Sequence, residues 1–127
     1  MGKRAILTEL VAKPFGIFSQ GMRAGNLIFV SGQVSRNVRG ELVGKGDIKA
    51  QTRQCIENLQ SVLQAAGGTL NDVVKVTVFV ANMGHLMEIH EVRAAYFRPP
   101  YPVSTLVQVS RFTDADFLIE IEAIVAI

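Results

Sequence analysis

Few side chains of this chain carry chemistry by their type alone, and their spacing matches no common catalytic pattern. The 127 residues include one cysteine, Cys55, and two histidines, His85 and His90. One cysteine cannot build an internal disulfide framework, and three such residues are too few for a structural zinc site. The sequence also lacks a phosphate-binding glycine loop, a Gly-x-Ser-x-Gly elbow and a His-Glu-x-x-His helix. The residue types therefore point to neither metal, phosphate nor serine-triad chemistry.

His90 and Cys55 each allow a functional and a purely structural interpretation. The reference pKa of histidine lies near neutrality, so His90 could act as a general acid or base. A histidine on a helix surface or at an interface explains the same position without chemistry, and His85 fits that second description. Cys55 falls on the apolar face of a predicted helix and nothing in the sequence activates it. We therefore expect Cys55 to pack in the core.

Two amphipathic segments and several β-rich runs must position these residues. Apolar residues recur at helical spacing over residues 47–66, between an N-cap at Asp47 and the stop signal Gly67–Gly68. A second helix is expected from Leu86 to Phe97, because Pro99–Pro100 cannot continue it. Turn signals and β-branched runs predict strands at Asn26–Ser31 (paired with a segment near Ser19–Arg23), Val73–Val80, Thr105–Val109 and Phe117–Ile127.

This order of elements predicts an α+β fold, with one mixed sheet and two helices packed on a single face. Strand alternation over residues 73–80 groups four side chains on one face: Val74, Val76, Val78 and Val80. Two helices leave the other face uncovered, and there we expect Phe79, Leu118 and Ile124 or their neighbours. An uncovered apolar face predicts that the chain associates with copies of itself.

Length and composition are those of an ordinary globular domain. Hydrophobic residues make up 49% and charged residues 19% of the chain, which predicts a folded core rather than disorder. The length fits a single domain over residues 1–127. No stretch approaches the ~20 apolar residues of a membrane span, and the N-terminus does not resemble a secretory signal. Together with the cysteine usage, these features predict a cytoplasmic protein with no membrane partner.

The net charge of +2 divides unevenly along the chain. Residues 1–53 carry +6 and residues 54–127 carry −4. A basic half could bind an anionic partner such as RNA. However, the basic residues over 36–49 stand among glycines and polar residues, and no aromatic side chains are interleaved with them. A solvated loop explains this pattern, so we do not expect nucleic-acid binding.

Several short segments occur in an order that is typical of one family. They are Phe18–Gly21, Gly25–Gln33, Gln51–Gln54 with Asn58–Leu59, Ala65–Gly68, Asp72–Val80, Tyr101–Pro102 and Ile119–Ile124. In these segments the chain resembles the RidA/YjgF superfamily of reactive-intermediate deaminases over nearly its whole length. The resemblance implies a chorismate-mutase-like fold and a homotrimer whose sheets form an inner barrel. It also implies a small-molecule ligand in the clefts between subunits, and the hydrolysis of imines or enamines without metal or cofactor.

The resemblance assigns roles to three residues that match the family pattern. Glu120 stands where the family glutamate positions the attacking water, and Ser31 and Gly32 stand where the family holds its ligand. Each residue also has a structural interpretation. Glu120 could be an ordinary charged strand residue like Glu122 two positions on, and Ser31 could cap its own turn with Gly32.

The remaining site positions depart from the family pattern. Ser104 replaces an arginine that binds the substrate carboxylate, and a hydroxyl supplies neither the planar fork nor the charge. Leu106 replaces a frequent cysteine, Phe18 a frequent tyrosine and His90 a common asparagine. The backbone at Thr105 and Leu106 would still hold substrate. A nearby arginine, residue 111, is expected to form a structural ion pair rather than to replace the missing arginine.

Two functions remain open from the sequence. The first is a cofactor-free hydrolase of a small imine, enamine or related nitrogen compound, with Glu120 as the catalytic residue. Because Ser104 lacks the charged contact, the usual 2-imino acids are not expected to be its substrates. The alternative is a non-catalytic trimer that binds a small metabolite, and the loss of three polar family residues from one cleft favours it.

Overall fold

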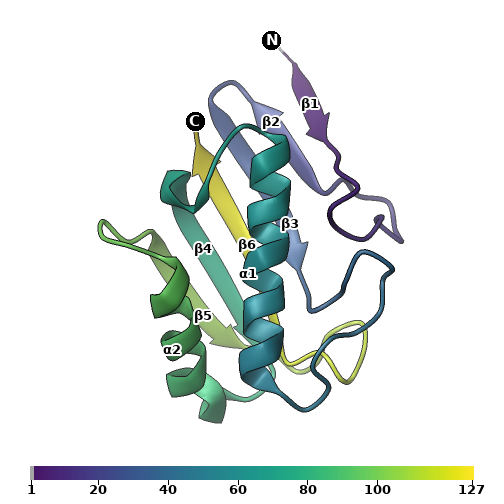
Figure 1. Cartoon of the computed structure of the whole chain (residues 1–127), viewed down its shortest axis with the longest axis vertical. Helices are drawn as coiled ribbons and strands as arrows, with labels where there is room; N and C mark the ends of the chain where they lie inside the picture. The colour runs from purple at the N-terminus through teal and green to yellow at the C-terminus, as the bar shows by residue number, and fades with distance from the viewer. Residues whose placement is uncertain (1) are drawn as a thin grey trace.

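The centre of the computed structural model, which describes residues 2–127, is one six-stranded sheet (Figure 1). Its strands lie in the order β1-β2-β3-β6-β4-β5, and only β4 and β5 are parallel neighbours. The strand bounds are β1 Lys3–Ile6, β2 Gly21–Ala24, β3 Leu27–Gln33, β4 Val73–Val80, β5 Val103–Gln108 and β6 Ile119–Ala126. The predicted strands are therefore present, whereas β1 was not expected from the sequence.

Two helices, α1 at Ile48–Ala65 and α2 at Leu86–Tyr96, cover the same face of this sheet (Figure 1). Two short 3₁₀ segments, η1 at Leu70–Asp72 and η2 at Met83–His85, precede β4 and α2. The arrangement confirms the expected α+β fold with one mixed sheet. Neither helix of the described residues is long and apolar enough to pass through a membrane.

The ends of α1 are where its caps predict them. The Asp47 side chain accepts a hydrogen bond from the Ala50 amide at 3.0 Å, which satisfies one free N–H of the first turn. At the other end, Gly67 has a φ of +82°, a left-handed conformation that glycine adopts without strain. The bounds of this helix could therefore be predicted to within a residue.

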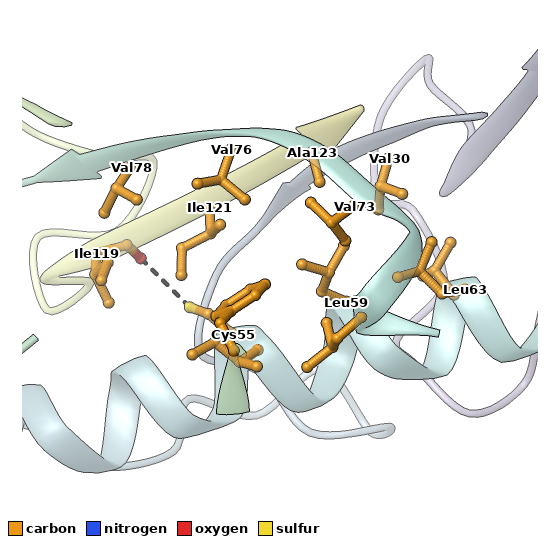
Figure 2. Close-up of a cluster of buried hydrophobic side chains, with 14 of the residues drawn as sticks. Val30, Cys55, Leu59, Leu63, Val73, Val76, Val78, Ile119, Ile121 and Ala123 are labelled. Carbon is orange, nitrogen blue, oxygen red and sulfur yellow. Dashed lines mark hydrogen bonds between the residues drawn. The ribbon is translucent and has the colours of Figure 1, made fainter. Parts of the chain in front are cut away.

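The buried side of α1 packs against the sheet at β6 and β3. Cys55 is fully buried there, and its Sγ lies 3.7 Å from the Ile119 carbonyl oxygen (Figure 2). Burial, with a smaller contribution from the Glu120 charge, raises the pKa of the Cys55 thiol. A buried, protonated thiol is a packing group and not a nucleophile. The expected core position of Cys55 is confirmed.

The face assignment of one predicted strand residue is wrong. Alternation placed Val74 with Val76 on the buried face, but Val74 is 45% exposed and Val73 is in the core. The cause is an irregularity between Val73 and Lys75 in the pairing of β4 with β6. A bulge of this kind adds one residue to a strand and reverses the alternation beyond it.

Within residues 2–127, no helix covers the second face of the sheet (Figure 1). Phe29 is 43% exposed there, beside its half-buried partner Ile124. Phe79 also lies on this open face, opposite Glu120. Leu118 instead packs against the core, where its amide donates to the Gln51 side chain. The open face is therefore partly apolar and carries at least one carboxyl group.

Candidate functional site

All but one of the site residues that the sequence analysis selected fall into two separate hollows. Glu120, Ser31, Gly32 and Phe18 line a hollow of about 310 Å³. A groove of about 580 Å³ between α2 and β5 is lined by three others: His90, Ser104 and Leu106. The two lie on opposite faces of the sheet, because Ser104 pairs with buried Val76 whereas Glu120 pairs with Phe79 of the open face.

The absence of a side chain at Gly32 leaves room for the carboxyl group of Glu120. The pairing of β3 with β6 shifts register between Val30 and Gln33, and Gly32 lies in this irregular stretch. A Cβ atom at residue 32 would overlap the Glu120 carboxylate. Only glycine therefore leaves room for the carboxyl group in its present position. The two residues that the sequence analysis linked through the resemblance are direct neighbours.

The surroundings of Glu120 favour its protonated form. Burial raises the pKa of the Glu120 carboxyl above its usual range, and the charge of Glu122 adds to the effect. Among residues 2–127, no basic side chain forms an ion pair with it. A carboxyl group whose pKa is moved towards neutrality can both accept and return a proton.

The side chains beside Glu120 are partly committed to structural contacts. The Ser31 hydroxyl donates to the Ser19 carbonyl at 2.5 Å, so only its lone pairs are free for a ligand. This bond replaces the turn-capping contact with Gly32 that we considered from the sequence. Phe18 packs edge-to-face against Phe15 with 6.0 Å between ring centroids. These residues form one wall of the hollow.

One arginine, Arg111, lies near Glu120 on the open face. Arg111 and Glu120 both line a depression of about 440 Å³ on the open face. The Arg111 guanidinium donates to the Phe112 carbonyl at 3.1 Å, and within the described part of the chain it forms no ion pair. The structural ion pair expected of Arg111 is therefore not found.

The groove on the helical side contains an arginine that the sequence analysis did not select. Arg93 of α2 lines it together with His90 and Ser104. One Nη atom of Arg93 donates to Ser104 Oγ at 2.9 Å. The sequence spacing could have indicated Arg93, because it follows His90 by three residues and side chains at that spacing share a helix face.

Arg93 lacks an acidic partner in the described chain. Burial lowers the pKa of its guanidinium, and no opposite charge contributes to the shift. Two acidic side chains of the helices have other partners. Glu91 pairs with Lys49 at 2.8 Å, and Glu57 accepts a hydrogen bond from Tyr96 at 2.9 Å. Arginine stays protonated in proteins, so the groove holds one positive charge without a counter-charge.

Thr105 lies in neither hollow. It pairs with Thr77 in the β4–β5 ladder, which turns its side chain to the open face, away from Ser104. Its predicted ligand contact is a backbone contact and does not depend on that orientation. His90 is exposed on α2, whereas His85, which we expected on the surface, is half-buried.

Other candidate chemistry has little support from the geometry. Within residues 2–127, no three His, Cys, Asp or Glu side chains gather in a way that could hold a metal ion. Three basic residues of the N-terminal half form ion pairs with nearby acids: Arg39, Lys45 and Lys49. A fourth, Arg36, stacks on the Phe15 ring at 4.1 Å from its centroid. The basic half is therefore partly neutralised within the chain itself.

The fold and the hollow around Glu120 define a class of small α+β proteins with many known members. Residues 9–127 match the family model described as Endoribonuclease L-PSP. The chain is 49% identical over 123 residues to a RutC family protein of Pyrococcus horikoshii, covering 96% of both chains. It is 35% identical over 125 residues to a protein of Dermatophagoides farinae named 2-iminobutanoate/2-iminopropanoate deaminase, covering 98% and 97%.

The solved structures agree with the sequence matches. A Yersinia pestis protein of the conserved Rid protein family superposes with a TM-score of 0.94 at 33% identity, covering 99% of this chain and all of the other. The chain therefore belongs to the RidA/YjgF superfamily, whose family model carries the endoribonuclease description.

Proposed function

We propose that the chain is a cofactor-free hydrolase of small imines or enamines, with Glu120 as the catalytic residue. The observation that carries the proposal is the Glu120 carboxyl group, half-buried in an open hollow with a raised pKa and a glycine beside it. The deaminase name of a relative supports the reaction class. The whole chain, residues 1–127, acts as one domain in the cytoplasm.

In the proposed reaction, Glu120 moves one proton twice. Its carboxylate takes a proton from water as the water oxygen bonds to the imine carbon, and the imine nitrogen takes up one proton from solvent. The resulting carbinolamine then collapses. The carbon–nitrogen bond breaks, the hydroxyl group releases its proton to solvent as the carbonyl forms, and the nitrogen leaves as ammonia after receiving the proton from Glu120. Water supplies all the added atoms, so the step requires no oxidant or reductant.

The proposal includes a homotrimer with its active sites between subunits. One chain cannot bring Ser104 to Glu120, because they lie on opposite faces of the sheet. β5 is an edge strand of the sheet, so the groove beside it lies at the rim where a neighbouring copy can reach it. The exposed apolar groups of the open face favour burial against such copies. Sedimentation of the purified chain tests this assembly.

The substrate depends on how a carboxylate would be held. Ser104 supplies no charge, and for this reason the sequence predicts that the usual 2-imino acids are not substrates. The Arg93 guanidinium in the same groove is a reason to include 2-imino acids among the compounds assayed. Both 2-imino acids and imines without a carboxylate belong in the first panel.

Exchange of Glu120 for glutamine tests the catalytic proposal. We expect Glu120→Gln to lower the hydrolysis rate of enzymatically generated imines by roughly 10²- to 10⁴-fold, as loss of general base catalysis does. Glu122→Gln is the matched control, since it removes a carboxylate of the same strand that is not in the hollow. Equal rates for native protein and Glu120→Gln would contradict the proposal.

The alternative is a trimer that binds a metabolite without converting it. The Ser31 hydroxyl favours this alternative. It donates its hydrogen to the Ser19 carbonyl, so it cannot donate a proton or a hydrogen bond to a reacting group. The two functions differ in one measurement. If the native chain binds small ligands but leaves imine hydrolysis at the uncatalysed rate over the whole panel, the binding function is correct.

A further inference from the structure

The groove between α2 and β5 combines a polar end with apolar walls. Arg93 and Ser104 form the polar end, with His90 nearby on α2. Most of the remaining lining is apolar: Met83, Leu86, Ala94, Phe97, Pro102 and Leu106. Concave sites with few polar groups among apolar walls are the usual form of small-molecule sites.

The polar end has hydrogen-bond donors that the protein itself does not use. Ser104 Oγ accepts the bond from Arg93, so the hydroxyl hydrogen is free to donate to another acceptor. Arg93 has further N–H groups in the plane of its guanidinium. These donors converge from two elements, and their combined charge is positive. An acceptor with a negative charge satisfies both.

A single negative charge fits this groove better than a double one. Among the described residues that line it, Arg93 is the one cation. A phosphate dianion would keep an uncompensated charge among the apolar walls, which is unfavourable. A carboxylate carries one charge and matches the planar guanidinium.

We propose that Arg93 and Ser104 together bind the carboxylate of a small monoanionic ligand, so that α2 supplies the charged contact that β5 lacks. The charge comes from the helix and the hydroxyl from the strand. The biological role of this binding rests on the proposed function, because it names carboxylate-bearing imines as the substrate class. The binding itself does not depend on catalysis.

The test compares two unreactive ligands that differ in charge. Butanoate and its neutral analogue butanamide are titrated against the full-length native chain, with binding followed by NMR. We expect native protein to prefer butanoate, and Arg93→Met to bind it roughly 10- to 100-fold more weakly, as loss of charged hydrogen bonds predicts. Binding of butanamide should not change. Equal affinity for the two ligands, or a preference for inorganic phosphate, would overturn the proposal.

Two matched arginine variants control for general charge effects. Arg98→Met removes a nearby exposed charge that bonds only to backbone carbonyls. Arg111→Met removes the arginine beside Glu120 on the opposite face. Both should bind butanoate like the native chain. If Arg111→Met loses the affinity and Arg93→Met keeps it, the anion site is on the open face and the proposal is wrong.

A double variant guards against simple misfolding. Arg93→Met combined with Ser104→Arg moves the guanidinium from α2 to β5 within the same groove, and we expect it to regain butanoate binding. Glu120→Gln separates this inference from the proposed function. If it binds butanoate but hydrolyses no imine, both proposals stand. If the native chain binds butanoate but never hydrolyses an imine, only the proposed function fails.

Discussion

The hollow around Glu120 and the groove around Arg93 each hold one charged side chain, but by different means. Glu120 is positioned by strand register and by the missing side chain of Gly32. Arg93 is positioned by a helix that packs beside an edge strand, and its one side-chain partner is a serine hydroxyl. We therefore expect the hollow to be sensitive to backbone changes and the groove to tolerate exchanges between its two walls.

The largest effect should follow a change of one methyl group in the hollow. In Gly32→Ala, the new Cβ occupies the space of the Glu120 carboxylate and displaces it. We expect imine hydrolysis to fall about 100-fold or more, as for loss of the base itself, while butanoate binding in the groove stays unchanged. Steady-state kinetics measure the fall in hydrolysis, and the NMR titration measures butanoate binding. Native turnover in this variant would show that the carboxyl position is not critical.

A smaller effect is expected when the groove loses its hydroxyl. Ser104→Ala removes one neutral partner but keeps the Arg93 charge. The net value of such a hydrogen bond predicts roughly 2- to 10-fold weaker butanoate binding. Titration of the variant beside Arg93→Met gives the comparison. A larger loss for Ser104→Ala than for Arg93→Met would reverse the roles that we assign to the two residues.

The pH dependence of hydrolysis should separate the two causes of the Glu120 shift. As a base, Glu120 must be deprotonated, and its raised pKa places the acidic limb of the kcat/KM profile above the usual glutamate range. Glu122→Gln removes the smaller cause, so the limb should move to lower pH but only part of the way, because burial remains. An acidic limb that does not move would exclude the Glu122 charge as a cause.

The smallest effect is expected at the residue between the two sites. Thr105→Val changes a side chain on the open face, whereas Ser104 beside it faces the groove. Butanoate binding should therefore match that of the native protein in the same titration. A clear loss would mean that the open face of β5 contributes to the anion site.

The sequence predicted the elements better than their exact packing. Helical periodicity and caps located α1 to within a residue, since these signals are local. The bulge that exposes Val74 depends on pairing with β6, so strand alternation alone could not find it. The short edge strand β1 has only four residues and carries little pattern of its own.

The candidate site also has a part that the sequence predicted and a part that it did not. Ser31, Gly32 and Glu120 could be grouped from the sequence because the family resemblance joins two strands that pair in the sheet. Arg93 could not be linked to Ser104 from the sequence. Their contact depends on how α2 packs beside β5, which the local pattern of neither segment specifies.

The single thiol of the core offers a built-in probe of how the molecule opens. Cys55 is fully buried between α1 and the sheet, so a thiol reagent can reach it only when that layer separates. When the layer opens and closes much faster than the reagent reacts, the modification rate of Cys55 reports the free energy of that separation. Any ligand that binds the closed chain should slow the labelling in proportion to its occupancy. Labelling of Cys55 can therefore detect ligand binding at either candidate site.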